Sequence, residues 1–461
     1  MNSPVILWFR DDLRLADHAA LHAAIETGRP ILPVYVLDDS QPWPLGAATR
    51  WWLHRSLTSL AEALAAKGSG LVLRRGAAVE VMPRLAEEAA AAAVFTGGLA
   101  DPAARATDHA IASGLTPRGV RFHRMRTATL FGPEEVKTKA GGSYGVYTPF
   151  SRACLALGPP RDPLPAPQAM PPAPTVSSDR LSDWHLLPTV PDWAGGLRET
   201  WAPGEAGARD RLDKFLTGTI SGYAAQRDVP GVEGTSMLSP HLRFGEISAT
   251  QVYHAIRSRA EGEGANKFIN ELLWREFSHH LLWHHPMLPD APLRPDFASM
   301  SWRDDPAGLE AWRHGRTGVP IVDAGMRQLW HTGWMHNRVR MIVASFLIKH
   351  LLIDWRLGEQ WFWDTLVDAD LANNAASWQW VAGCGADAAP FFRVFNPVLQ
   401  GQKFDPEGAY VRRWLPELRT VDNRYIHSPW ETGHRPPIVG LAEGRARALA
   451  AFASLRGQTS A

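Results

Sequence analysis

The chain has 461 residues, 45% of them hydrophobic and 21% charged, which is the composition of a folded globular protein of about two to three domains. Its 48 Lys and Arg residues nearly balance its 47 Asp and Glu residues, so net charge alone cannot attract a polyanion, and any nucleic-acid site must be a local basic patch. Because it has two cysteines, no N-terminal signal pattern and no apolar run long enough to span a bilayer, the chain is expected to be cytoplasmic and to lack a membrane helix.

Residues 1–130 alternate between strand and helix patterns. Apolar runs rich in Val and Leu occupy Val5 to Phe9, Ile31 to Leu37, Leu71 to Leu73 and Ala93 to Phe95. Ala-rich helical patterns separate them, and the alanine run from Ala89 to Ala93 favours a helix face. This alternation predicts a doubly wound α/β domain with a parallel sheet. The turn after the first strand, Phe9 to Arg14, has neither a Gly-x-Gly-x-x-Gly nor a Gly-Lys-Ser/Thr pattern, which argues against a conventional NAD domain or a nucleotide triphosphatase.

Residues 131–205 are predicted to be a connector. Eight prolines lie between Pro159 and Pro174, and proline at that density interrupts both helices and sheet ladders. After the connector, helical spacing dominates in Thr250 to Arg259, Lys267 to Trp283 and Ala324 to Leu352. Residues 206–461 are therefore predicted to form an all-α domain.

The segment Lys267 to Trp283 is a helical pattern with two different faces. Its apolar positions are Ile269, Leu272, Leu273 and Phe277, and its polar positions are Glu271, Trp274, Arg275 and Ser278. A carboxylate, an indole and a guanidinium on one stripe suit a planar anionic ligand such as a base and its phosphate. The alternative interpretation is a surface face with an i,i+4 pair between Glu271 and Arg275.

Other segments offer candidate phosphate ligands. Arg338 and Arg340 precede an apolar helix pattern, although solvated arginines are the alternative. Ser236 lies in a run of hydroxyl residues that could hold a phosphate at the start of a helix. The alternative there is a simple helix cap, with Ser239 before Pro240.

Two acids and two amides lie close together from Asp368 to Asn374, in what the sequence suggests is one loop. They lack the further acids of a calcium site, so hydrogen bonding to a ribose or to the backbone is favoured over a metal. In a following helix, Trp378 and Trp380 would project about 200° apart, one facing inward and the other facing a pocket.

Histidines gather at 279, 280, 284 and 285, and His280 and His284 have the i,i+4 spacing that could hold zinc. No Glu follows His280 to complete a metalloprotease motif, so a half-buried helix face is the favoured interpretation. We therefore expect no metal site.

In this order and at these spacings, the motifs resemble the DNA photolyase and cryptochrome family over nearly the whole chain, most closely its class I-type cyclobutane pyrimidine dimer photolyases. The segments that carry the resemblance are Leu7 to Arg14, Asn270 to Phe277, Thr317 to Ala324, Gly333 to Arg338, and Phe395 to Pro397. The family plan implies an antenna-type α/β domain in residues 1–130, a connector in 131–205 and a helical FAD-binding catalytic domain in 206–461.

The resemblance also implies the functional residues. The FAD ligands would be Tyr223, Thr235, Ser236, Met237, Leu238, Ser239, Arg340, Asp368, Ala369, Asp370 and Asn374. The DNA and lesion contacts would be Arg227, Glu271, Trp274, Arg275, Asn337, Arg338, Met341, Trp380, Arg393 and Gln400. The catalytic set would be Glu271, which would hydrogen-bond the dimer; Asn374, beside flavin N5; and an electron relay of Trp378, Trp355 and Trp302.

The activity implied by the resemblance is light-driven DNA repair, in which excited reduced FAD donates an electron to a flipped-out dimer, the ring splits and the electron returns. The sequence from Met335 to Arg338, together with Asn374, favours repair over a cryptochrome-type photoreceptor. A helical DNA-binding or scaffold protein without a cofactor is the alternative from another class. A second, antenna chromophore is compatible with the family, but Thr96 to Pro102 departs from its folate and deazaflavin patterns, so no residues are assigned to it. The expected partner is DNA containing pyrimidine dimers, bound by a monomer.

Overall fold

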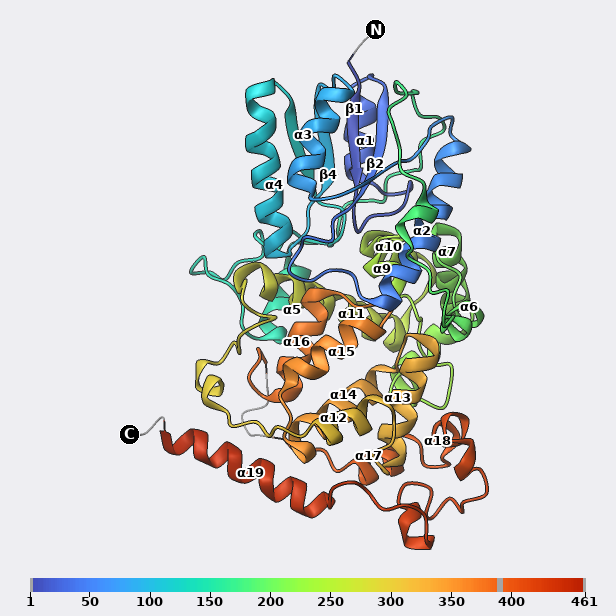
Figure 1. Cartoon of the computed structure of the whole chain (residues 1–461), viewed down its shortest axis with the longest axis vertical. Helices are drawn as coiled ribbons and strands as arrows, with labels where there is room; N and C mark the ends of the chain where they lie inside the picture. The colour runs from blue at the N-terminus through green and yellow to red at the C-terminus, as the bar shows by residue number, and fades with distance from the viewer. Residues whose placement is uncertain (1–2, 388–392, 459–461) are drawn as a thin grey trace.

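The computed structural model describes residues 3–387 and 393–458. Two parts are stacked along the long axis of the molecule, an α/β part that contains the N-terminus and a helical part that contains the C-terminus (Figure 1). No helix of the described segments is both long and apolar enough to cross a membrane.

The α/β part is built on a five-stranded parallel sheet. Its strands are β1 (Val5–Phe9), β2 (Ile31–Leu37), β3 (Val72–Arg75), β4 (Ala93–Gly97) and β5 (Arg121–Met125), in the order β3-β2-β1-β4-β5. The central strand is in register with both neighbours, Val5 opposite Ile31 on β2 and opposite Ala93 on β4. The predicted doubly wound α/β fold is confirmed.

Helices cover both faces of the sheet. They are α1 (Ala19–Glu26), α2 (Ala47–Ala65), α3 (Ala78–Glu88) and α4 (Pro102–Leu115). On β1, Val5, Leu7 and Phe9 pack in one cluster with α1 and α2. Ile6 and Trp8 point to the other face and pack with α3 and α4. This division follows from the alternation of side chains along a strand.

Two expectations about the α/β part need correction. The alanine run is not a helix face, because α3 ends at Glu88, Ala90 takes a left-handed φ of 49°, and β4 begins at Ala93. The edge strand β5 was not predicted. It mixes basic residues with Phe122 and Met125 and is only partly buried, so it gives no continuous apolar signal.

The connector is not structureless. It contains α5 (Tyr147–Ala156) and α6 (Gly195–Thr200), and its extended segments pack on the α/β part through Met170 and Trp184. The division into residues 1–130, 131–205 and 206–461 stays a prediction.

The remaining helices form the second part. They are α7 (Glu205–Lys214), α8 (Tyr223–Gln226), α9 (Ser239–Arg243), α10 (Ala249–Arg259), α11 (Gly262–His284), α12 (Pro306–Arg313), α13 (Pro320–Thr332), α14 (Asn337–Ser345), α15 (Trp355–Thr365), α16 (Leu371–Ala382), α17 (Pro397–Phe404), α18 (Ala409–Trp414) and α19 (Leu441–Gln458). Short 3₁₀ segments span Thr116–Arg118, Leu181–Trp184, Ile220–Gly222, Pro295–Ser299, Pro416–Leu418 and Pro429–Thr432, and π-helical segments span Phe215–Thr219 and Phe346–Leu351. The pattern predicted from Ala324 to Leu352 is interrupted, because Gly333 ends α13 in a left-handed conformation with a φ of 64°.

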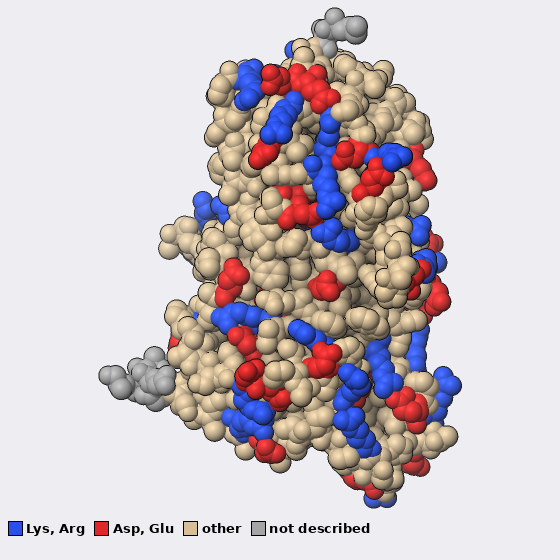
Figure 2. Space-filling view, in the orientation of Figure 1, with Lys and Arg blue, Asp and Glu red and all other residues tan. Residues whose placement is uncertain are grey.

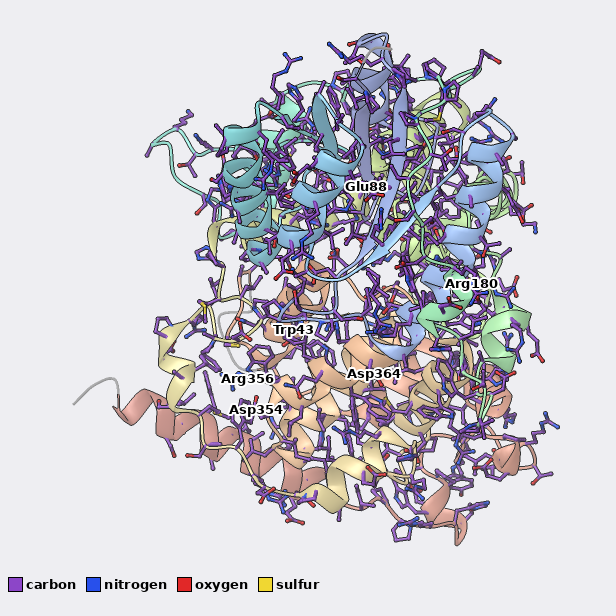
Figure 3. All side chains as sticks on the ribbon, turned by 45° about the horizontal axis from the view of Figure 1, so that its top comes forward. Trp43, Glu88, Arg180, Asp354, Arg356 and Asp364 are labelled. Carbon is purple, nitrogen blue, oxygen red and sulfur yellow. The ribbon has the colours of Figure 1, made fainter. Side chains whose placement is uncertain are left out.

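The two parts meet at the loop between β2 and α2, where Trp43 lies close to α15 (Figure 3). The Trp43 ring packs edge-on against Trp363 at 5.4 Å between centroids. The Trp363 indole donates a hydrogen bond to Pro44 O at 2.7 Å, and Asp364 accepts one from the Ala47 N–H at 2.9 Å. These contacts fix α15 against the α/β part.

Candidate functional site

The central helix α11 presents most of the polar stripe that the sequence predicts: Glu271, Trp274 and Arg275 are half-buried, whereas Ser278 is buried. Its apolar residues Ile269, Leu272, Leu273 and Phe277 are all buried. On the opposite face, Glu271 pairs with the Arg227 guanidinium at the end of α8, and Lys267 Nζ lies 4.0 Å from the same carboxylate. Arg275 instead donates to Ala128 O at 2.8 Å. The alternative i,i+4 pair between Glu271 and Arg275 is therefore not formed.

A second pair lies next to the first. Asp228 is 3.7 Å from Arg227 Nε, and its Oδ2 is 2.8 Å from Arg338 Nη2 at the start of α14. The Arg338 guanidinium also lies over the Phe404 ring, 4.3 Å from its centroid. The candidate DNA-binding arginines of α8 and α14 are thus brought together through Asp228. The sequence analysis missed this acid, although it directly follows Arg227.

The remaining candidate lesion and DNA residues lie on nearby elements. Asn337 is exposed at the first position of α14 and Met341 is half-buried one turn later. Trp380 and Arg393 line a small cavity of about 30 Å³ that also contacts Ser345. Gln400 is half-buried on α17, and Trp274 is half-buried on α11. The face in Figure 2 shows basic and acidic side chains interspersed.

The two tryptophans of α16 differ in environment, as predicted. Trp378 is 2% exposed and packs edge-on against Phe362, 5.0 Å between centroids. A Cβ added to Gly358 on α15 would lie 2.2 Å from the Trp378 ring, so only glycine allows this close approach. Trp355 at the start of α15 is also buried, and Trp302 is half-buried before α12. The three relay candidates therefore run from fully buried to partly exposed.

The hydroxyl-rich segment lies just before α9. Thr235 and Ser236 are half-buried and Ser239 is exposed, whereas Leu238 between them is buried. Met237 has a left-handed φ of 51°. Ser236 Oγ accepts a hydrogen bond from the Leu238 N–H at 3.3 Å.

Ser239 does not cap α9, contrary to the alternative considered above. It is the first residue of the helix, and its Oγ accepts a hydrogen bond from the Trp334 indole at 3.2 Å. The alternative of a Ser239 cap is therefore wrong, because the chain enters the helix at Leu238 without a side-chain cap.

The acids after α15 lie at the N-terminus of α16. Arg340 forms a two-pronged ion pair with Asp368, at 3.1 and 2.8 Å, and its Nε donates to Met335 O at 2.7 Å. Asp370 caps α16 by accepting from the Asn373 N–H at 2.8 Å. The two amides are thus in the first helical turn, which corrects the single loop expected from the sequence.

The electrostatics of this N-terminus are set by buried partners. Burial opposes ionisation of Asp370, but the charges of His279, Arg275 and Arg243 outweigh it and lower the pKa of Asp370 to about 2. Burial lowers the pKa of His279 to about 4. Arg243 also donates to the backbone oxygen of Ala369, which is itself buried.

Two further cofactor candidates are buried. The Asn374 amide donates to the backbone oxygen of Glu359 at 3.0 Å, which fixes its orientation. Tyr223 on α8 is 6% exposed and packs edge-on against Phe215 and Phe268.

His280 acts as a structural contact. Its Nε2 accepts from the Tyr144 N–H and its Nδ1 contacts Pro133 O, both at 3.0 Å. Both ring nitrogens thus tie α11 to the connector. Across residues 3–387 and 393–458, no group of three or more His, Cys, Asp or Glu side chains is placed to hold a metal.

The residues around α9, α14 and α16 fit FAD by the chemistry of their donors. The hydroxyls of Thr235, Ser236 and Ser239 and the cation of Arg340 suit a pyrophosphate and ribose. The fixed amide of Asn374 suits a polar edge of a flavin ring. The hydroxyl segment remains accessible although Leu238 and Trp334 beside it are buried, which leaves it open to a ligand.

A larger cavity, of about 370 Å³, lies at the carboxyl ends of the strands. It is lined by residues that include Trp8, Arg10, Tyr35, Asp101, Arg124 and Trp283. In this sheet β2 and β3 lie on one side of β1, and β4 and β5 lie on the other. The direction of strand order therefore reverses at β1, and ligands of open α/β sheets bind at such a reversal. The sequence assigned no residues to this cavity, because its place follows from the order of the strands in the sheet, which the structure shows.

Comparisons with known proteins agree with this architecture. A family model described as "DNA photolyase" matches residues 5–169, and one described as "FAD binding domain of DNA photolyase" matches residues 268–454. The chain belongs to the DNA photolyase and cryptochrome family. It is 49% identical over 476 residues to the deoxyribodipyrimidine photo-lyase of Agrobacterium fabrum, with 99% of each chain covered.

Two solved structures are similar over their whole length. A bacterial class III photolyase from Agrobacterium tumefaciens superposes with a TM-score of 0.95 at 49% identity, covering 99% of this chain and 98% of that one. An archaeal photolyase from Sulfolobus tokodaii, solved with two FAD molecules, superposes with a TM-score of 0.83 at 30% identity, covering 98% and 100%.

Proposed function

We propose that this chain is a deoxyribodipyrimidine photo-lyase, an enzyme that uses blue light to split cyclobutane pyrimidine dimers in DNA. The observation that carries the proposal is the stripe of Glu271 and Trp274 on α11, beside two paired arginines and on a helix that packs against α16. Bound FAD, when reduced and excited, supplies the electron that opens the dimer.

The lesion must leave the base stack to reach the site. Trp274 and Trp380 offer flat surfaces for its bases, and Asn337 and Met341 complete the pocket. Glu271 would hydrogen-bond the dimer, and an acid proton donated in that bond stabilises the negative charge that develops on the dimer. The flanking phosphates are contacted by Arg227, Arg275, Arg338, Arg393 and Gln400.

The FAD would be held by Tyr223, Arg340, Asp368, Ala369, Asp370, Asn374 and the segment from Thr235 to Ser239. The Arg340 pair with Asp368 fixes the guanidinium, and the Asn374 amide would face the reactive edge of the flavin. Trp378, Trp355 and Trp302 would carry electrons from the surface to an oxidised flavin. We propose that the chain acts as a monomer in the cytoplasm, on DNA that contains dimers.

The relative at 49% identity is described as a class III photolyase, whereas the motifs resemble the class I-type enzymes most closely. We propose class III for this chain, because that relative matches it over nearly its full length. We also propose that the cavity at the strand ends holds a second, light-harvesting chromophore. Its aromatic lining, which includes Trp8, Tyr35 and Trp283, suits a planar conjugated ligand.

Glu271→Ala separates repair from a photoreceptor function. Repair of an oligonucleotide with one thymine dimer should fall at least roughly tenfold, as for loss of a group that stabilises developing charge. Photoreduction of the flavin should persist. Glu263→Ala, an exposed acid on the same helix, is the control and should leave both unchanged. Light-dependent flavin chemistry without any repair by the unaltered chain would favour the photoreceptor alternative.

A further inference from the structure

Trp274 does not stand alone on the stripe of α11. The ring of Tyr147, the first residue of α5, lies parallel to it, with 3.7 Å between centroids and 6° between planes. Phe277 meets both rings edge-on, at 6.0 Å from Tyr147 and 5.9 Å from Trp274. One face of the indole is therefore covered by a flat aromatic ring.

Tyr147 is itself held from two directions. Its hydroxyl donates to Asn270 O at 2.8 Å, on α11 one turn before Trp274. Its backbone N–H faces the Asp387 carboxylate, in the turn that follows α16. Tyr147 therefore links the helix that carries Trp274 to the chain just beyond the helix that carries Trp380.

A half-buried indole without such support can take several side-chain rotamers, and each must be given up when a base stacks on it. A parallel neighbour fixes the plane of the ring before the ligand arrives, which lowers the entropic cost of binding. With one face covered, the opposite face is the one that a base can use.

We propose that Tyr147 is a positioning residue for lesion recognition, which holds Trp274 so that its open face receives a base of the flipped-out dimer. This role rests on the proposed function. Tyr147 acts through Trp274, whose ring it covers on one face.

The test uses the full chain with FAD and compares Tyr147→Met with Tyr147→Phe. Methionine fills much of the same volume without a flat ring, and phenylalanine keeps the ring without the hydroxyl. Binding in the dark is measured with a dimer-containing oligonucleotide and with an undamaged one of the same sequence. Far-UV circular dichroism, flavin absorbance and flavin photoreduction report on the fold, and Tyr147→Leu replaces Tyr147→Met if the latter does not fold.

Tyr147→Met should weaken binding of the dimer-containing oligonucleotide roughly tenfold. The affinity for undamaged DNA, the photoreduction of the flavin and the repair rate at saturating DNA should not change, because only ground-state positioning is lost. Tyr147→Phe should stay within about twofold of the unaltered chain, because the stack is retained. Dimer affinity that is unchanged in Tyr147→Met, or a parallel loss for both DNAs, would overturn the role. An unaltered chain that binds both DNAs equally would overturn the proposed function itself, and this role with it.

Discussion

The Arg227 guanidinium is bonded to the Glu271 carboxylate, so a cation expected to contact DNA holds the acid expected to contact the lesion. Asp228 holds Arg338 in the same way, at 2.8 Å. A DNA phosphate that binds Arg227 must compete with Glu271 for the guanidinium. Displacement of Glu271 by the phosphate would leave that carboxyl group available to the dimer. With those two expected roles, backbone binding and lesion recognition would be coupled through one ion pair.

Arg227→Ala should weaken binding of undamaged DNA, because a phosphate contact is lost whatever the sequence. The plot of log affinity against log salt concentration should become shallower by about 1 in slope, the value for one lost phosphate contact. Fluorescence anisotropy titrations at several salt concentrations measure it. Arg84→Ala, an exposed arginine on α3, should leave the slope unchanged. An unaltered slope in Arg227→Ala would remove this residue from the DNA interface.

Trp378→Phe should slow photoreduction of oxidised flavin by at least an order of magnitude, because phenylalanine is far harder to oxidise than tryptophan. Binding of the dimer in the dark should not change, since Trp378 is buried among Phe362, Trp312 and Gly358, away from the stripe. Transient absorption after a laser flash measures the first step. Trp193→Phe is the control, an exposed tryptophan of the connector. Equal photoreduction in both variants would contradict the relay.

Asp368→Asn should lower FAD retention, because it breaks the two-pronged pair that holds the Arg340 guanidinium. Asp368 is almost fully buried and Arg340 only partly so, which predicts a loss of affinity of roughly tenfold rather than a collapse of the fold. The ratio of flavin to protein absorbance after purification measures it. Arg356→Gln provides the comparison, since its pair with Asp354 on α15 is more exposed (Figure 3). That variant should keep its FAD.

Glu276 should make stability depend on pH. Burial raises its pKa from 4.5 to about 7, despite Arg275 and the N–H groups of Leu130 and Phe131. The folded state therefore holds a proton that the unfolded state releases, so stability falls as pH rises from about 4.5 to about 7. The loss is roughly 3 kcal/mol by linkage.

Glu276→Gln keeps an acceptor for both backbone N–H groups but cannot ionise. From about pH 4.5 to about pH 7, the unfolding free energy of the unaltered chain should fall relative to that of Glu276→Gln. Above about pH 7 the difference between the two should stay constant. Urea titrations at several pH values measure it. A difference that does not vary with pH would show that Glu276 titrates normally in the fold.

The parts of this fold that could be predicted from the sequence are those with a strong local pattern of apolar residues. Val5 to Phe9 is a continuous apolar run because both faces of β1 are covered. The stripe of α11 follows from 3.6-residue spacing. β5 was missed because an edge strand with exposed arginines lacks such a run, and the break at Gly333 was missed because one residue stops a helix without changing the pattern around it.

The site residues show a second limit. Glu271 and Trp274 lie one turn apart and were grouped by spacing alone, but Arg227 reaches Glu271 across 44 residues of chain. No local pattern indicates such a contact, nor the Asp228 bridge to Arg338, 110 residues away. Resemblance to a family supplied Arg227, Glu271 and Arg338 one by one, whereas their pairing, and the part of Asp228 in it, became visible only in three dimensions.

The central claim is that light drives the opening of a DNA lesion by this chain. The most direct measurement is the reappearance of intact thymines in an oligonucleotide with a single thymine dimer, mixed with purified reduced protein and exposed to blue light. We predict restoration in the light and none in a matched dark sample. Equal amounts of dimer in both samples, from protein that carries reduced FAD, would contradict the account.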